Sequence, residues 1–133
     1  KIMNLEEEVK KFMSSKNKST MTATEYQEQA KTTAIFPANS ALEYLSLGLV
    51  GEAGEIANKV KKIIRDKKVA GTQNADYLDF SNDIASEIGD VLWYCAMLAD
   101  YFEVNLGKVM EHNIHKLKDR KLRGVLGGSG DKR

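Results

Sequence analysis

The chain has 133 residues, the size of one domain, and 42% of them are hydrophobic. Its 20 Lys and Arg nearly balance its 19 Asp and Glu, which gives a formal net charge of +1. This balance argues against a general binder of nucleic acid or of membrane surfaces, because such proteins need a basic excess. One Cys excludes a disulfide within the chain, and neither a transmembrane-length apolar run nor a signal peptide is visible. We therefore expect a cytoplasmic protein.

Residues 1–20 are predicted to form a short helix followed by a linker. Asn4 is a typical N-cap residue, and apolar residues recur behind it at helical spacing. The polar stretch SSKNKST that follows predicts the linker. Residues 21–123 would then form the main helical domain, and residues 124–133, which contain four glycines, a C-terminal tail.

Four longer helices are predicted in the main domain, each introduced by a residue that favours a helix N-cap. They span Thr22 to about Thr33, Ser40 to about Asp66, Ser81 or Asn82 to about Glu103, and Asn105 to about Lys121. The first two begin with the capping-box patterns Thr22-x-x-Glu25 and Ser40-x-x-Glu43. Residues 67–80 are predicted to be a loop. The expected fold class is therefore all-α, a bundle of about four main helices.

Two of these helices carry matching pairs of acidic residues. At about 100° per residue, Glu52 borders the apolar stripe of its helix and Glu55 lies about 60° further round. Glu87 and Asp90 have the same placement on the next helix. Helices packed through these stripes would gather four carboxylates, whose repulsion a hard cation such as Mg²⁺ would relieve. One such pair alone is usually a solvated helix face, but two pairs in matching phase predict a Mg²⁺–phosphate site.

Two longer motifs surround the acidic pairs, Gly48-Leu-Val-Gly-Glu-Ala-Gly-Glu-Ile-Ala57 and Glu87-Ile-Gly-Asp-Val-Leu-Trp-Tyr94. They resemble the MazG enzymes, which are all-α, oligomeric nucleoside triphosphate pyrophosphohydrolases, and the resemblance covers roughly residues 22–133. It implies Mg²⁺-dependent hydrolysis of (deoxy)nucleoside triphosphates to monophosphate and pyrophosphate, with Mn²⁺ as a substitute metal. The metal-binding and catalytic residues would be Glu52, Glu55, Glu87 and Asp90.

Several predicted helices are apolar over more than one face, which predicts a homodimer or homotetramer. Nucleotide-pool house-cleaning is the expected role. Neither nucleic acid nor a membrane is an expected partner. Three alternatives stay open: a dimeric dUTPase, a phosphoribosyl-ATP pyrophosphohydrolase on the same fold, or a non-catalytic helical module that senses nucleotide.

The last predicted helix supplies candidate contacts to the triphosphate. Asn113, Lys116 and Arg120 fall on one of its faces. A solvated basic helix end, favoured by the helix dipole, would explain basic residues here but not Asn113. The resemblance implies that this face binds the substrate phosphates.

Lys59 and Tyr94 are the remaining candidate substrate-binding residues. Lys59 follows Glu55 by four residues, so it either contacts phosphate or pairs with that carboxylate. Tyr94 lies near the Glu87 edge of its helix and is the best candidate for stacking on the base. Three glycines at intervals of three, from Gly48 on, predict a close approach of another helix.

Overall fold

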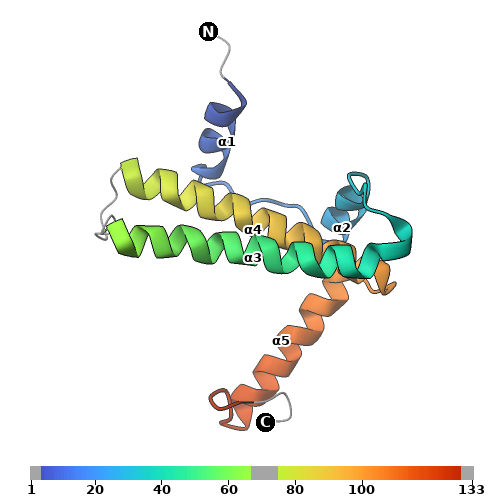
Figure 1. Ribbon diagram of the computed structural model, residues 1–133. Coiled ribbons are helices and arrows are strands. Elements are labelled where there is room, and N and C mark those ends of the chain that lie inside the picture. The colour runs from blue at the N-terminus through green and yellow to red at the C-terminus, as the bar shows by residue number, and fades with distance from the viewer. Residues whose placement is uncertain (1–3, 67–74, 130–133) are drawn as a thin grey trace.

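The computed structural model describes residues 4–66 and 75–129, with residues 75–79 described by their backbone alone. Over these residues it is all-helical, which confirms the predicted fold class. The elements are α1 (Leu5–Met13), α2 (Ala23–Lys31), the 3₁₀ turn η1 (Ala38–Ser40), α3 (Ala41–Asp66), α4 (Ala75–Tyr101) and α5 (Leu106–Leu122). The long helices α3 and α4 pack side by side and antiparallel, α2 packs on α4, and α5 projects away from the α3–α4 pair (Figure 1). None of the helices described here has the length and apolarity of a membrane span.

Side-chain caps begin three of the helices at the predicted positions. Asn4, Thr22 and Asn105 each accept a hydrogen bond from a backbone N–H of the first helical turn. The Glu25 carboxylate accepts from Thr22 N at 2.7 Å, which completes the capping box of α2. These caps satisfy N–H groups that a helix leaves without an intrahelical partner. The predicted starts of α1, α2 and α5 are confirmed.

The predicted start of α4 is wrong, and the predicted start of α3 is right although Ser40 does not cap it as expected. The helix α4 begins at Ala75, not at Ser81 or Asn82, and the remainder of the predicted loop, 67–74, lies outside the described residues. The first residues of α4 include two acidic residues and neither Gly nor Pro, a composition that suits a helix N-terminus. The helix α3 begins at Ala41, directly after Ser40, as predicted. Ser40 ends η1, however, and its hydroxyl donates to Asn39 Oδ1 instead of forming the predicted capping box with Glu43.

The core is small and lies where α2, α4, α5 and the first part of α3 meet. Its buried residues are Ala30, Leu45, Ala96, Met97 and Leu106. Trp93 packs against this core, and its indole N–H donates to Thr33 Oγ1 at 2.8 Å, so it links α4 to α2. The apolar stripes predicted for α3 and α4 continue beyond the core, where Val60 is still 39% exposed.

A buried glutamine of α2 holds the turn between α4 and α5. The Gln27 side chain donates to Val104 O at 2.9 Å and accepts from Leu106 N at 2.7 Å. Glu103 adopts a positive φ of 57° in the same turn, a conformation that costs a non-glycine residue energy. The turn is thus held in one conformation by contacts with α2.

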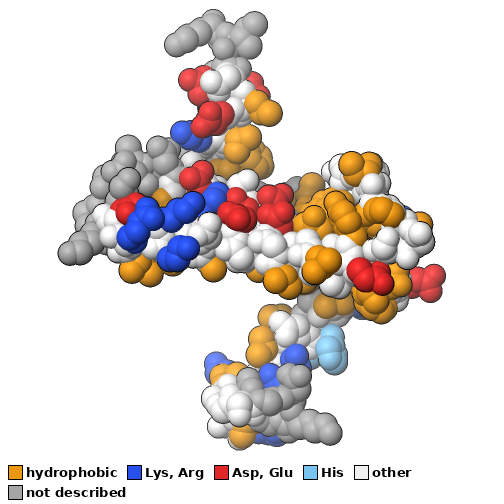
Figure 2. Space-filling model, in the orientation of Figure 1, with side chains coloured by type: hydrophobic (Ala, Val, Ile, Leu, Met, Phe, Trp, Pro, Cys, Tyr) orange, Lys and Arg blue, Asp and Glu red, His pale blue; other side chains and the backbone are white. Residues whose placement is uncertain are grey.

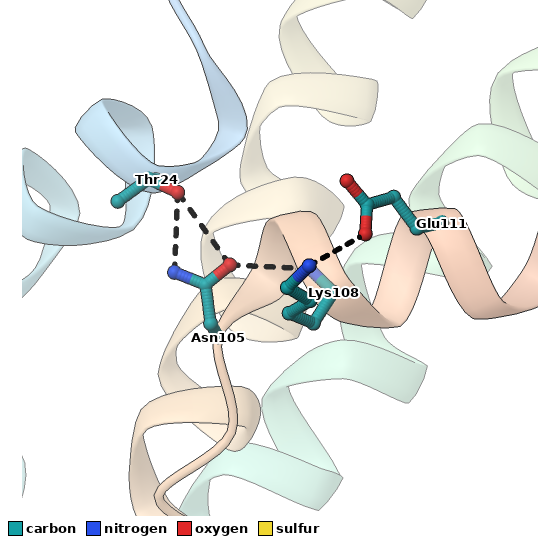
Figure 3. A network of polar contacts seen from close by, with 4 residues as sticks. All are labelled: Thr24, Asn105, Lys108 and Glu111. Carbon is teal, nitrogen blue, oxygen red and sulfur yellow. Dashed lines mark hydrogen bonds and ion pairs between the residues drawn. The ribbon is translucent and has the colours of Figure 1, made fainter.

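A second polar network joins α2 to the start of α5 (Figure 3). The Asn105 amide donates to Thr24 Oγ1 at 3.1 Å, and its Oδ1 accepts from Lys108 N. Lys108 Nζ in turn pairs with Glu111 one turn along α5. Together with the glutamine contacts, this network fixes the direction in which α5 leaves the α3–α4 pair.

Candidate functional site

Three carboxylates from α3 and α4 meet on one side of the helix pair. Glu52, Glu87 and Asp90 each offer an oxygen, and these three oxygens lie within 4.8 Å of one another. Asp90 is exposed and the two glutamates are half-buried, so the cluster is open to solvent. Figure 2 shows acidic side chains along the middle of the α3–α4 pair, with basic side chains next to them toward one end. The structure thus brings together three of the four predicted metal ligands.

The carboxylates of this acidic cluster repel one another. The pKa of Glu52 is raised above its ordinary value, first by burial, then by the charges of Asp90 and Glu87, a hydrogen bond with Glu87, and the charge of Glu55. Glu55, the fourth predicted ligand, is exposed and lies one turn further along α3. A raised carboxyl pKa means that the cluster disfavours a further negative charge. A bound cation would offset that excess.

Lys59 offsets part of this charge from the side of α3. Its Nζ lies 2.6 Å from Glu87 Oε1 and 3.4 Å from the carbonyl oxygen of Asp83. The hydrogen bond to Glu87 is the main reason why the pKa of Lys59 is raised. The predicted pairing with Glu55 is therefore wrong, because Lys59 lies on the face of α3 that contacts α4 and pairs across the two helices.

Tyr94 lies beside the acidic cluster and packs α4 closely against α3. A Cβ placed on Gly48 would overlap the Tyr94 ring, so the predicted close approach is confirmed at this glycine. The pKa of Tyr94 is raised first by burial, then by Tyr44, with which it shares a hydrogen bond, and by Glu52 and Asp90. The sequence did not point to Tyr44, although this residue lies one helical turn before Gly48, against which the ring of Tyr94 packs.

These tyrosines belong to a row of four aromatic rings. Phe36 stacks on Tyr44 with centroids 5.8 Å apart, and it meets Trp93 edge-on at 6.4 Å. Trp93 in turn meets Tyr94 edge-on at 5.0 Å. Tyr44 is 45% exposed and gives this row an accessible ring next to Tyr94.

The other two glycines of the α3 motif do not behave like Gly48. A Cβ on Gly51 or on Gly54 would meet nothing within 4 Å in this chain. The prediction that a neighbouring helix approaches them closely is wrong for a single chain. Two helical glycines on an open surface lower the helix propensity of α3 without any packing gain within the chain.

The predicted phosphate-binding residues of α5 do not join the acidic cluster of their own chain. Asn113 and Lys116 are exposed on α5, the helix that projects away from the α3–α4 pair (Figure 1). Arg120 is only 5% exposed, and its carbonyl accepts from Val125 N in the turn that ends α5. A buried guanidinium is less accessible to phosphate than the two exposed side chains.

Residues 40–124 match the family model of the MazG nucleotide pyrophosphohydrolase domain. This range is more than half of the chain and contains α3, α4 and α5. The chain belongs to the MazG family. The MazG match includes both acidic pairs, whereas α1 and α2 precede it. The α2 contacts that orient α5 therefore come from outside the matched MazG range.

A phage protein is similar to this MazG chain over most of its length. The Gene 37 protein of Mycobacterium phage L5 is 49% identical over 114 residues, which cover 81% of this chain and 96% of the phage protein. Its name states no activity. No solved structure matches the chain significantly.

Proposed function

We propose that this MazG protein hydrolyses (deoxy)nucleoside triphosphates between the α and β phosphates, giving monophosphate and pyrophosphate. The observation that carries the proposal is the acidic cluster, three carboxylate oxygens within 4.8 Å of one another on two packed helices. Membership of a nucleotide pyrophosphohydrolase family supports the same reaction. We also propose that the protein is cytoplasmic and serves in nucleotide-pool house-cleaning.

The residues of the cluster fit Mg²⁺, with Mn²⁺ as a substitute. Glu52, Glu87 and Asp90 offer hard oxygen donors, which Mg²⁺ prefers, and the exposed side of the cluster leaves room for water and phosphate. The pKa of Glu52 is raised first by burial and then by the charges of Asp90 and Glu87, and a divalent cation would relieve the repulsion among these carboxylates. When bound, Mg²⁺ would polarise phosphate oxygens and lower the pKa of a coordinated water.

The side chains around the cluster then have separate roles. Glu52, Glu87 and Asp90 would hold the cation, and Glu55, exposed one turn away, would orient or deprotonate the attacking water. Lys59 pairs with Glu87, and its ammonium group would also be available to a phosphate bound at the cluster. Phosphate transfer depends mainly on such positioning and charge neutralisation, so these groups need no covalent step of their own.

The base and the outer phosphates would be bound by more distant groups. Tyr94 and its neighbour Tyr44 offer aromatic surface for the base beside the cluster. Asn113, Lys116 and Arg120 stay predicted contacts to the triphosphate. Because α5 projects from its own α3–α4 pair, we expect these residues to serve the site of a second copy.

A substrate screen with Mg²⁺ tests this proposal. The purified chain is incubated with common and damaged nucleoside triphosphates, including dUTP, and with phosphoribosyl-ATP, while pyrophosphate and monophosphate are measured. Pyrophosphate release from several triphosphates is expected. Turnover of dUTP alone or of phosphoribosyl-ATP alone would assign the narrower activity instead. Nucleotide binding without any turnover would contradict the enzyme and favour a sensing module.

A further inference from the structure

The side chain of Lys59 reaches from α3 to a carboxylate of the acidic cluster on α4. Its Nζ lies 2.6 Å from Glu87 Oε1, and it also donates to the carbonyl oxygen of Asp83 at 3.4 Å. The Lys59 and Glu87 side chains are only 28% and 15% exposed. A partly buried ion pair is screened much less by water and salt than a pair at the surface. The ammonium group therefore acts strongly on the carboxylates around it.

The partner of Lys59 is itself one of the three carboxylates that fit a divalent cation. Oxygens of Glu52, Glu87 and Asp90 lie within 4.8 Å of one another, and Glu87 also shares a hydrogen bond with Glu52. A carboxylate that pairs with an ammonium group attracts a metal ion less strongly, and the ammonium charge itself repels the ion. In the metal-free protein, Lys59 thus supplies positive charge that a divalent cation would otherwise supply.

A second partner for Lys59 would arrive with the substrate. Lys59 follows Glu55 by one helical turn and Glu52 by two, so it lies at the edge of the cluster on the same face of α3. Figure 2 shows this change from acidic to basic side chains along the α3–α4 pair. A triphosphate bound to a metal ion brings several negative charges to that edge. Phosphate oxygens form strong charge-assisted hydrogen bonds with an ammonium group, and they can replace Glu87 as its partner.

We propose that Lys59 changes its partner, from Glu87 in the metal-free protein to a substrate phosphate when a metal–triphosphate complex binds. The site then favours the metal–triphosphate complex over the free metal ion, because only the complex supplies a phosphate that draws the ammonium group away from Glu87. By linkage, a bound phosphate tightens the metal by the same factor by which the metal tightens the phosphate. This inference rests on the proposed function, since it takes the acidic cluster to be the metal site.

Removing the ammonium group should therefore have opposite effects on the two ligands. Lys59→Met should tighten the binding of the metal ion alone by about tenfold, because the ion loses a neighbouring positive charge. The same substitution should weaken the binding of phosphate about ten- to a hundredfold, because a charge-assisted contact is lost. A lysine that only held Glu87 in position would give a different result, since its removal would weaken the binding of both ligands.

Titration with Mn²⁺ alone, followed by the electron paramagnetic resonance of the free ion, measures the first effect without substrate or turnover. Lys59→Met should bind Mn²⁺ about tenfold more tightly than the wild-type chain. Lys61→Met is the matched control, because it removes the same charge from an exposed residue about 200° further round α3. Lys59→Gln keeps a donor for Glu87 without the charge and should behave like Lys59→Met. Circular dichroism would verify that all three variants keep their helices.

Calorimetric titration with inorganic tripolyphosphate at saturating Mg²⁺ measures the second effect with a probe that has no base. Lys59→Met should bind tripolyphosphate about ten- to a hundredfold more weakly than the wild-type chain, and Lys61→Met should bind it nearly as well. Equal Mn²⁺ affinity in Lys59→Met and Lys61→Met, or unchanged tripolyphosphate binding in Lys59→Met, would overturn this inference alone. Failure of the wild-type chain and every variant to bind Mn²⁺, with or without tripolyphosphate, would overturn the proposed function as well.

Discussion

Replacing Gln27 tests whether the α4–α5 turn is held as the structure indicates. Gln27→Ala removes two hydrogen bonds, to Val104 O at 2.9 Å and from Leu106 N at 2.7 Å. Leu106 is buried, so its N–H loses its partner without gaining water, at a cost of about 1–3 kcal/mol. Val104 is 41% exposed, and its carbonyl can bond to water at little cost. We expect a loss of about 2 kcal/mol in the free energy of unfolding.

Thermal and urea unfolding measure this loss. For a chain of this length, about 2 kcal/mol corresponds to a fall in Tm of about 6–10 °C. Gln29→Ala is the matched control, because Gln29 is exposed on the same helix and should change stability by less than about 0.5 kcal/mol. Gln27→Met, which keeps most of the volume, should lose nearly as much as Gln27→Ala. Equal stability of the Gln27 and Gln29 variants would refute the role of these hydrogen bonds.

Three further predictions concern the site and its helices. In the metal-free protein, the raised pKa of Glu52 contributes stability that is present below the ordinary carboxyl pKa and is lost as pH rises through the raised value. Glu52→Gln should therefore raise Tm near pH 7 but hardly change it at about pH 4. It should also weaken the stabilisation of the protein by Mg²⁺. The same change in Tm at both pH values would contradict this reasoning. Lys116→Ala should lower kcat/KM about ten- to a hundredfold, because a charge-assisted contact is worth about 1.5–3 kcal/mol. Equal small effects of Lys116→Ala and Lys121→Ala would mean that the basic residues of α5 are solvated and do not contact the substrate. Gly48→Ala should destabilise the chain, because its Cβ would overlap the ring of Tyr94 on α4. Gly51→Ala should stabilise an isolated chain by about 1 kcal/mol, because its Cβ would meet nothing. If urea unfolding shows Gly48→Ala to be the more stable variant, the close approach of α3 and α4 is contradicted.

Local patterns were sufficient to predict most helices of this chain. Asn4, Thr22 and Asn105 cap helices because each side chain accepts from a backbone N–H within the next turn, an interaction set by neighbouring residues alone. The start of α4 was missed because Ser81 is a residue type that favours a helix N-cap, although in the structure it lies inside a helix that already begins at Ala75. Ser40 was misjudged because a 3₁₀ turn, which has no strong sequence signature, continues directly into α3.

The acidic pairs were predictable because helical phase places them relative to an apolar stripe. Packing of α3 on α4 brings Glu52, Glu87 and Asp90 together as the two stripes require. The partner of Lys59 was not predictable, since an i, i+4 rule sees only its own helix and the structure pairs it with Glu87 across two helices. Helical phase also cannot show how helices that touch only at one end are directed in space, which is why the projection of α5 emerged only from the structure.

One comparison of variants tests most directly whether the acidic cluster is the catalytic centre. Pyrophosphate release from a nucleoside triphosphate is measured with Mg²⁺ for the wild-type chain, Glu87→Gln and Glu43→Gln. Both substitutions remove one negative charge, but Glu43 is exposed near the start of α3 and does not belong to the cluster. We predict that Glu87→Gln abolishes most turnover while keeping its helical content, and that Glu43→Gln retains wild-type turnover. Wild-type turnover in Glu87→Gln, or equal loss in both variants, would contradict the claim.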